Sequence, residues 1–387
     1  MRKGFLSLLV FFILAVAGAA RAQLVRGTTV RAGSPEDQAM DAISAATDPA
    51  QRLALIDKFM ADFGQGDMAI IANELYVSYY ADAKDYAKMA DYCQKILAAD
   101  PDNFNAAIHL ARAESELGNI ALLFDAGEKM NAIIVRYKAQ KPPADSAASD
   151  WQSRHDQALA DQHDQIEYVR DLLASAVFRS QSPADQAAYG ERFATDFPDS
   201  PYAAPCEALA AAGYQQLQNF PKMISTGENA LSIDPNNINA LLLLADYYSD
   251  KGIELDKAEA YAKKAIAVIP IAKKPDNVTD DRWQKQNSFQ TGLAWSAEGQ
   301  VLIHRDNLDG AASAFQKASP LLKSNTIYYA RNLYRLGFTY ARMKKIPEAT
   351  AALNEAASLN TPFKSLALQT LKDIQPSTPA PKKTSHE

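Results

Sequence analysis

Residues 85–118 read DYAKMADYCQKILAADPDNFNAAIHLARAESELG, and residues 219–252 read NFPKMISTGENALSIDPNNINALLLLADYYSDKG. Both stretches carry Asp-Pro near the middle and Gly at the end. Proline cannot continue the hydrogen-bond ladder of a helix, and glycine adopts the left-handed conformation that often ends one. Each stretch therefore predicts a helix that ends at Asp-Pro, followed by a second helix that ends at glycine.

The two stretches belong to a longer internal duplication. Residues 49–137 align without a gap with residues 183–271, and the alignment pairs proline with proline, aromatic with aromatic and glycine with glycine. The matched pairs include Pro49/Pro183, Phe59/Phe193, Phe63/Phe197, Tyr80/Tyr214, Lys88/Lys222, Met89/Met223, Leu110/Leu244 and Gly118/Gly252. Chance does not place so many special residues in one register, so we expect two copies of the same structural block.

A shorter period of 34 residues runs through both copies and resembles the tetratricopeptide repeat (TPR) family of the exported, cell-envelope type. We place repeat units at 70–103, 104–137, 204–237, 238–271, 292–325 and 330–363. The resemblance implies an all-α fold, a right-handed superhelical solenoid of antiparallel helix pairs. The composition agrees, because alanine is abundant and only 16 residues are glycine.

The predicted segments follow from the repeats and from the breaks between them. They are a signal peptide at 1–22, a flexible segment at 23–34, TPR block 1 at 35–137, a loop and connecting helix at 138–165, TPR block 2 at 166–271, a loop or connector at 272–291, a C-terminal TPR block at 292–372 and a disordered tail at 373–387.

The first 22 residues predict export. Arg2 and Lys3 form a charged start, an apolar run follows, and Ala20-Arg21-Ala22 fits a cleavage site. The apolar run is short for a membrane span, so we expect cleavage after Ala22 and a periplasmic or secreted protein with no integral span. The alternative is an uncleaved N-terminal anchor.

The sequence holds little that suggests an enzyme. It has no glycine-rich nucleotide loop, no Gly-x-Ser-x-Gly elbow and no His-Glu-x-x-His pair. His155 and His163 are eight residues apart, which on a helix is about 12 Å and too far for one metal ion. We therefore predict no catalytic residue, no metal and no cofactor. Cys93 and Cys206 are expected to be buried small apolar residues, with a disulfide as the alternative.

The resemblance to the TPR family implies that partners bind in a concave groove lined by the first helix of each unit. The groove positions include Asn105 and Arg112 in the first copy and Asn239 and Asp246 in the second. Residues 310–347 carry seven basic residues and no acid. Arginines with interleaved aromatic residues suit an acidic partner segment, and the alternative is a solvated basic flank. The candidate residues of this block are Arg331, Tyr334, Arg335, Phe338 and Arg342.

The sequence favours an exported, non-catalytic TPR scaffold or adaptor that mediates protein–protein interaction in the cell envelope. A net charge of -6 argues against bulk binding of nucleic acid. An alternative is an envelope assembly factor or a glycan- or ligand-binding protein, in which the loop residues Trp151 and Trp283 would stack on a ligand. A third hypothesis is an enzyme with an unrecognised site in the segments between the blocks.

Overall fold

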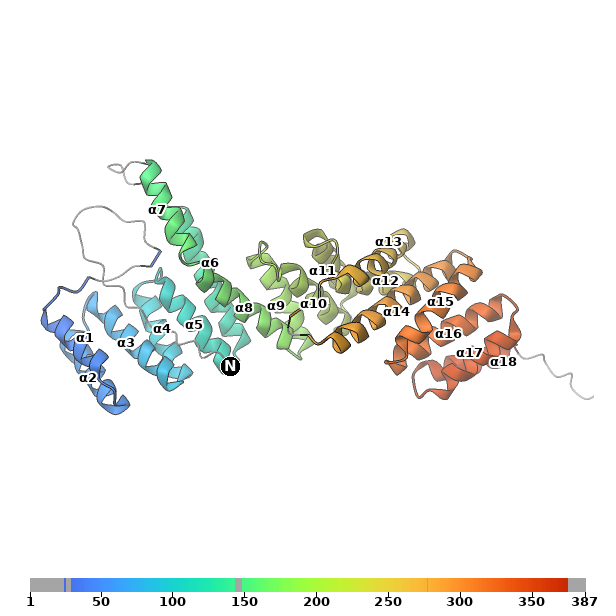
Figure 1. The fold of residues 1–387 in the computed structure, drawn as a ribbon, viewed down its shortest axis with the longest axis horizontal. Helices are drawn as coiled ribbons and strands as arrows, with labels where there is room; N and C mark the ends of the chain where they lie inside the picture. The colour runs from blue at the N-terminus through green and yellow to red at the C-terminus, as the bar shows by residue number, and fades with distance from the viewer. Residues whose placement is uncertain (1–23, 26–28, 143–147, 277, 375–387) are drawn as a thin grey trace, which may run out of the picture. The chain divides into compact units, whose positions relative to one another are not determined.

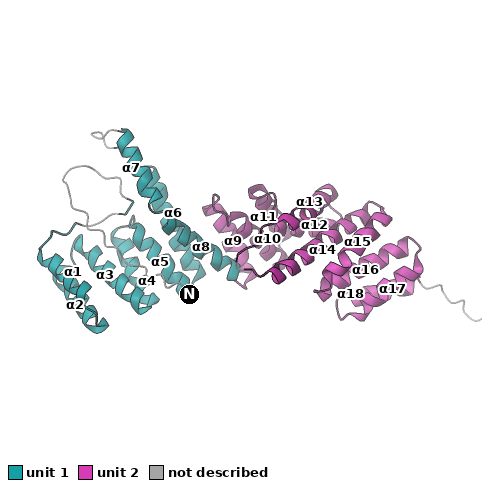
Figure 2. Cartoon of the chain, in the orientation of Figure 1, with its two compact units in different colours: residues 1–179 teal, residues 180–387 magenta. Residues whose placement is uncertain are grey.

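The computed structural model describes residues 24–25, 29–142, 148–276 and 278–374, and these residues form α-helices, one short 3-10 helix and no strand (Figure 1). The predicted signal peptide and residues 375–387 of the predicted tail lie outside the described residues. The chain divides into two compact units, residues 1–179 and residues 180–387, which we call unit 1 and unit 2 (Figure 2). None of the described helices is both long enough and apolar enough to cross a membrane.

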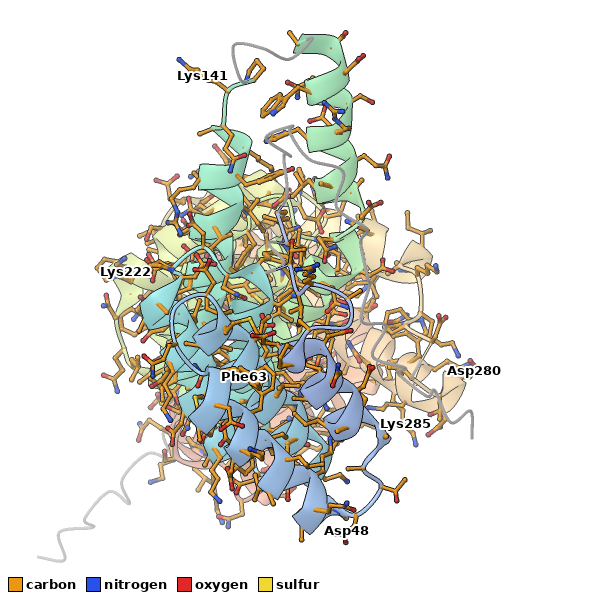
Figure 3. All side chains as sticks on the ribbon, turned by 90° about the vertical axis from the view of Figure 1, so that its left-hand side faces the viewer. Asp48, Phe63, Lys141, Lys222, Asp280 and Lys285 are labelled. Atoms are coloured by element: carbon orange, nitrogen blue, oxygen red, sulfur yellow. The ribbon has the colours of Figure 1, made fainter. Side chains whose placement is uncertain are left out.

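Unit 1 consists of eight described helices. They are α1 (Pro35–Ala45), α2 (Pro49–Phe63), α3 (Met68–Ala83), α4 (Tyr86–Ala99), α5 (Phe104–Leu117), α6 (Ile120–Lys138), α7 (Ala148–Ala160) and α8 (His163–Arg179). Each helix from α1 to α5 packs against the next one in the chain, and α8 packs against both α5 and α6. Figure 3 shows α2 running from its capping residue Asp48 to Phe63.

Unit 2 consists of ten described α-helices and the 3-10 helix η1. They are α9 (Pro183–Asp196), α10 (Ala203–Gln216), α11 (Phe220–Ile233), α12 (Ile238–Lys251), α13 (Leu255–Val268), η1 (Ile269–Ile271), α14 (Asp280–His304), α15 (Leu308–Leu322), α16 (Thr326–Arg342), α17 (Ile346–Ser358) and α18 (Phe363–Ile374). The predicted all-α fold of antiparallel helix pairs, the fold type of TPR proteins, is confirmed.

Helix ends follow the local sequence signals. The side chains of Asn103 and Asn237 accept hydrogen bonds from Ala106 N and Ala240 N, and so cap the start of α5 and of α12. Gly118 and Gly252 end the same two helices with φ of 73° and 67°, a conformation that costs glycine little. The duplicated stretches therefore end their helices by the same chemistry.

Unit 2 is built in two rows of helices. The first helix of each pair contacts the first helix of the next pair: α10 with α12, α12 with α14, α14 with α16, and α16 with α18. We call these five helices the inner row. Among the described residues, the second helices α11, α13, α15 and α17 make no comparable contacts with one another. The inner row is therefore the more tightly packed face, as expected for the inside of a curved helical repeat.

Two boundaries differ from the sequence prediction. The predicted block 166–271 places the region of α8 with the second copy, but α8 packs against α5 and α6 in unit 1, and the compact units divide after Arg179. The predicted connector 272–291 is a loop only in its first part, because α14 already begins at Asp280. The side chain of Thr279 caps this start by accepting a hydrogen bond from Arg282 N. The negative charges of Asp280 and Asp281 stabilise the first turn of the helix.

Candidate partner-binding site

The strongest candidate site is a pocket of about 300 Å³ on the inner row of unit 2. It is lined by side chains from α12, α14 and α16 and from the first residue of α18. The lining residues are Asp250, Gln300, Ile303, Arg331, Tyr334, Arg335, Phe338 and Phe363. Four of them, Arg331, Tyr334, Arg335 and Phe338, are site residues predicted from the sequence, so the structure brings these four together.

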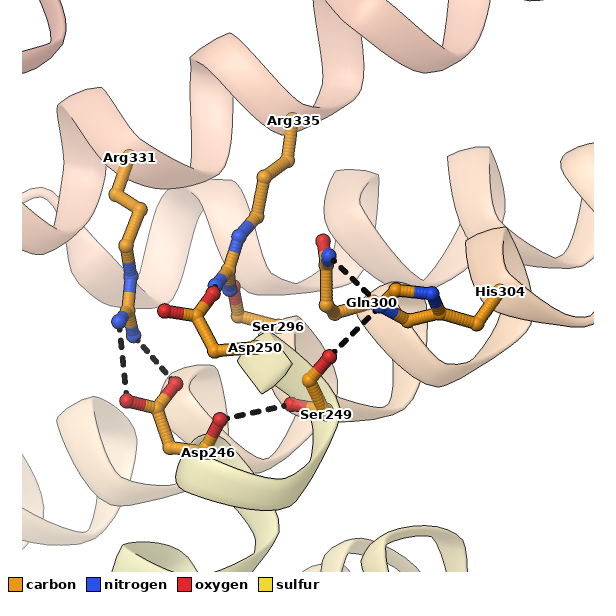
Figure 4. A network of polar contacts seen from close by, with 8 residues as sticks. All are labelled: Asp246, Ser249, Asp250, Ser296, Gln300, His304, Arg331 and Arg335. Atoms are coloured by element: carbon orange, nitrogen blue, oxygen red, sulfur yellow. Dashed lines mark hydrogen bonds and ion pairs between the residues drawn. The ribbon is translucent and has the colours of Figure 1, made fainter. Parts of the chain in front are cut away.

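Arg331 holds an ion pair that joins the last repeat to an earlier one. Its Nη1 and Nη2 donate to the two carboxylate oxygens of Asp246 over 3.0 and 2.7 Å (Figure 4). This bidentate geometry is the strong form of an arginine–carboxylate contact. Asp246 and Arg331 were predicted as separate groove positions, and the structure shows that they bind each other.

Arg335 makes a second pair one helical turn further along both helices. Its Nη2 donates to Asp250 and its Nη1 donates to Ser296 Oγ over 3.3 Å. Ser296 lies on α14, between the two helices that carry the ion pair, and is buried. Because serine is small, α14 leaves room for the arginines of α16 to reach α12, two helix pairs earlier (Figure 4).

The two pairs share one electrostatic environment. Burial raises the pKa of Asp246, but the charges of Arg331 and Arg335 outweigh this effect and leave it below the usual value. Burial and the neighbouring Arg331 lower the pKa of Arg335, while Asp246 and Asp250 act in the opposite direction. The two arginines and two aspartates thus form a network with no net charge. Removing any one of the four would leave an opposite charge without its partner.

The network continues through α12 into α14. Ser249 Oγ donates to the carbonyl oxygen of Asp246 over 3.0 Å, and His304 Nε2 lies 2.9 Å from the carbonyl oxygen of Ser249. Gln300 Nε2 lies 3.4 Å from the same histidine nitrogen (Figure 4). These contacts fix the end of α12 against α14, directly beside the pocket.

Aromatic side chains form one side of the pocket. The ring of Tyr334 lies 6.4 Å from that of Phe338 and 6.3 Å from that of Phe363, measured between centroids. Phe338 is 38% exposed, although it is large and apolar. Exposed aromatic side chains in a pocket are typical of residues that contribute strongly to binding.

The other predicted site residues lie outside the pocket lining. Arg342 Nη2 donates to Asp306 over 2.7 Å, and Asn239 Oδ1 accepts from Gln290 Nε2 over 3.3 Å. Asn105 and Arg112 lie on α5 in unit 1. The expected set of groove residues is therefore divided between a pocket and positions elsewhere in the two units.

The tryptophans of the alternative ligand-binding hypothesis are helical residues. Trp151 is buried on α7 and stacks on His155 with 4.4 Å between ring centroids, so its face is already covered. Trp283 lies in the first turn of α14 and is half-buried. His155 also stacks on Tyr137, with 4.2 Å between centroids. In the described part of the chain, no group of three His, Cys, Asp or Glu residues could hold a metal.

The cysteines behave as small apolar residues. Cys93 and Cys206 are fully buried free thiols on α4 and α10. Burial raises the pKa of each thiol to about 12, so both are protonated at neutral pH.

Sequence reasoning missed the pairing inside the site and several lining residues. Asp246 and Asp250 are spaced i, i+4, as are Arg331 and Arg335, and both pairs are separated by 85 residues. The signal for this internal contact was that two aspartates and two arginines have the same i, i+4 spacing on two first helices. Gln300, Ile303 and Phe363 carry no comparable signal, because polar and apolar residues are common on any helix.

Among the comparisons with known proteins, only the one with solved structures finds proteins that this chain resembles. No protein-family model and no curated protein matches the chain. The crystal structure of the APC/C hetero-tetramer Cut9-Hcn1 is 13% identical, covers 88% of this chain and 90% of its own, and has a TM-score of 0.28. Yeast Tom70 is 13% identical with coverages of 88% and 94% and a TM-score of 0.25. A monomeric IFIT1 mutant with m7Gppp-AAAA is 13% identical with coverages of 84% and 68% and a TM-score of 0.33. These scores are low, so our description of the fold rests on the helix pairs themselves.

Proposed function

We propose that the chain is a non-catalytic scaffold that binds a protein or peptide segment on the inner row of unit 2. The observation that carries this proposal is the pocket beside Tyr334, Phe338 and Phe363. It combines these aromatic rings with charged side chains that ion pairs hold in place. Binding sites of this kind are concave, largely pre-formed and supported by rigid elements. The ion pairs supply that rigidity, because they tie α16 to α12 across α14.

The scaffold role suits the chemistry of the pocket better than catalysis does. The pocket carboxylate and both guanidinium groups are engaged in ion pairs, so no unpaired charged side chain of the lining faces the cavity as a general acid or base. A partner carboxylate would have to displace Asp246 or Asp250 to bind these arginines. The acidic partner expected from the sequence stays a prediction.

The proposal is tested by a photoreactive amino acid at Phe338, with the same amino acid at Ile346 as the control. The two side chains are 38% and 37% exposed, but Ile346 is not part of the pocket lining. We expect a defined partner to cross-link in cells from position 338 and not from position 346. Cross-linking of the same proteins from both positions would contradict a site in the pocket.

We further propose that the protein works outside the cytoplasm, in the periplasm or after secretion. This part rests on the charged start, the apolar run and Ala20-Arg21-Ala22 in the sequence. Cell fractionation with N-terminal sequencing tests it, and we expect a mature protein that begins at Gln23. A chain that keeps Met1 and sediments with the membrane would support the anchored alternative instead.

A further inference from the structure

The most exposed charged side chain of the pocket lining is an aspartate, although residues 310–347 are rich in basic residues. In each ion pair of the network the carboxylate is the more exposed group. The side chain of Asp250 is 53% exposed and that of Arg335 is 6% exposed. The side chain of Asp246 is 28% exposed and that of Arg331 is 13% exposed. A ligand that enters the pocket therefore meets the oxygens of Asp250 before it meets a guanidinium group.

Besides the charged side chains, the lining holds the amide of Gln300, the apolar Ile303 and the aromatic rings of Tyr334, Phe338 and Phe363. The face of an aromatic ring attracts a cation within about 6 Å of its centroid, and the attraction grows when water is excluded. The same chain already uses this contact elsewhere. Lys317 Nζ lies 4.0 Å from the ring centroid of Trp295, and Lys95 Nζ lies 3.9 Å from that of Tyr92.

The arginines of the pocket do not exclude a cation. Arg331 and Arg335 are balanced by Asp246 and Asp250, so the network adds no net charge. The chain as a whole carries a net charge of -6, which favours the approach of a basic partner at long range. The pocket volume of about 300 Å³ lies at the lower end of ligand sites and suits one long side chain better than a folded surface.

We propose that the pocket takes a lysine or arginine side chain of the partner segment, held between the rings of Tyr334, Phe338 and Phe363 and the carboxylate of Asp250. This inference rests on the proposed function, because it names the chemistry of the partner for the same pocket. It reverses the partner charge that the basic residues of 310–347 suggest, since Arg331 and Arg335, the two that line the pocket, are already paired with Asp246 and Asp250.

The test is a selection from a random 12-residue peptide library displayed on phage, with the purified chain as bait. Selected peptides are then measured by fluorescence anisotropy against the native chain, Phe338→Leu and Phe220→Leu. Leucine keeps the apolar contact but removes the ring face. Phe220 is the matched aromatic control, because it lies on α11, contacts Tyr247 and is not part of the pocket lining.

We expect lysine or arginine to be enriched at one position of the selected peptides. Replacing that residue by norleucine, which has a similar length but no charge, should weaken binding about tenfold. Phe338→Leu should weaken the lysine peptide several-fold and leave the norleucine peptide unchanged, and Phe220→Leu should affect neither.

Two results would overturn the inference while the proposed function stands. One is enrichment of aspartate or glutamate in peptides that still require Phe338. The other is equal binding of the lysine and norleucine peptides. Peptides that bind Phe338→Ala as tightly as the native chain would contradict the proposed function itself, because their site would lie outside the pocket.

Discussion

Asp246 on α12 and Arg331 on α16 form a bidentate ion pair. Both were predicted to face the groove, and both lie on the inner row of unit 2. Periodicity gives the face of a helix, but it does not show which other helix that face meets. The partner of Arg331 is 85 residues away, and only the packing of the repeats brings it within hydrogen-bond distance.

Breaking this pair should destabilise unit 2. We expect Asp246→Asn to lower the free energy of unfolding by about 3 kcal/mol, because it leaves the guanidinium of Arg331 buried without its counter-charge. The double variant Asp246→Leu, Arg331→Met should recover most of the loss. Urea unfolding followed by tryptophan fluorescence measures both, and Lys285→Ala is the control.

The control rests on exposure. Lys285 pairs with Asp281 over 2.7 Å, but the two side chains are 71% and 74% exposed (Figure 3). Such a pair contributes less than about 1 kcal/mol. Equal effects of Asp246→Asn and Lys285→Ala would show that the inner network does not hold the repeats together.

Glu207 on α10 should make stability depend on pH. Its side chain is buried, its Oε2 has no hydrogen-bond partner, and burial raises its pKa to about 7, against a lowering hydrogen bond from Asn229. The pKa of this carboxyl is near 4.5 in the unfolded chain and about 7 in the folded one. The free energy of unfolding therefore falls as the pH rises from 4.5 to about 7 and does not fall further, on account of this group, above that pH.

Glu207→Gln should therefore stabilise the protein by about 2 kcal/mol at pH 8 and have little effect at pH 4.5. The difference in unfolding free energy between variant and native chain, measured across this range, isolates this group from the other titrating residues. A difference that does not vary with pH would refute the assignment.

At the scale of elements, the ends of α5 and α12 could be predicted because caps are local. Asn103, Gly118, Asn237 and Gly252 act through their own side chains or backbone angles, so the sequence alone reports them. The length of α14 could not be predicted in the same way. Its first turns were expected to be connector because Pro and Asn precede them, and the cap at Thr279 was overlooked.

Close packing between paired helices depends on glycine at α14. A Cβ at Gly299 would lie 2.6 Å from Phe315 Cε1 on α15, which is closer than real contacts allow. We expect Gly299→Ala to lower the free energy of unfolding by about 1–3 kcal/mol and a second change, Phe315→Leu, to remove part of that penalty. Thermal unfolding by circular dichroism gives both values.

Gly118→Ala is the matched comparison, because nothing lies within 4 Å of the added Cβ and only its φ of 73° opposes the change. Its cost should be about 1 kcal/mol and should not respond to Phe315→Leu. If Phe315→Leu changed the cost of both variants equally, contact with Phe315 would not explain the cost of Gly299→Ala.

At the scale of the whole molecule, the duplication predicts the fold of the repeats but not the position of the site. The counterpart of Asp246 in the first copy is Arg112, and that of Asp250 is Glu116. The same backbone therefore carries opposite charge at the first position in the two copies. The pocket also uses Phe363 and α16, which lie beyond the duplicated residues.

The division after Arg179 predicts that unit 2 folds without unit 1. A fragment of residues 180–374 should show the helical circular dichroism and the cooperative unfolding of a stacked repeat, since its helices contact one another along the whole unit. A fragment that is unfolded at 25 °C would show that the two units are not independent.

The central claim is that partners bind in the pocket beside Phe338. The most direct measurement is the dissociation constant of the partner segment identified by cross-linking, for the native chain, Phe338→Ala and Ile346→Ala. We predict a loss of at least about 30-fold for Phe338→Ala and less than about twofold for Ile346→Ala, because truncation at position 338 removes the exposed ring of the pocket. Unchanged affinity of Phe338→Ala would contradict a binding site in this pocket.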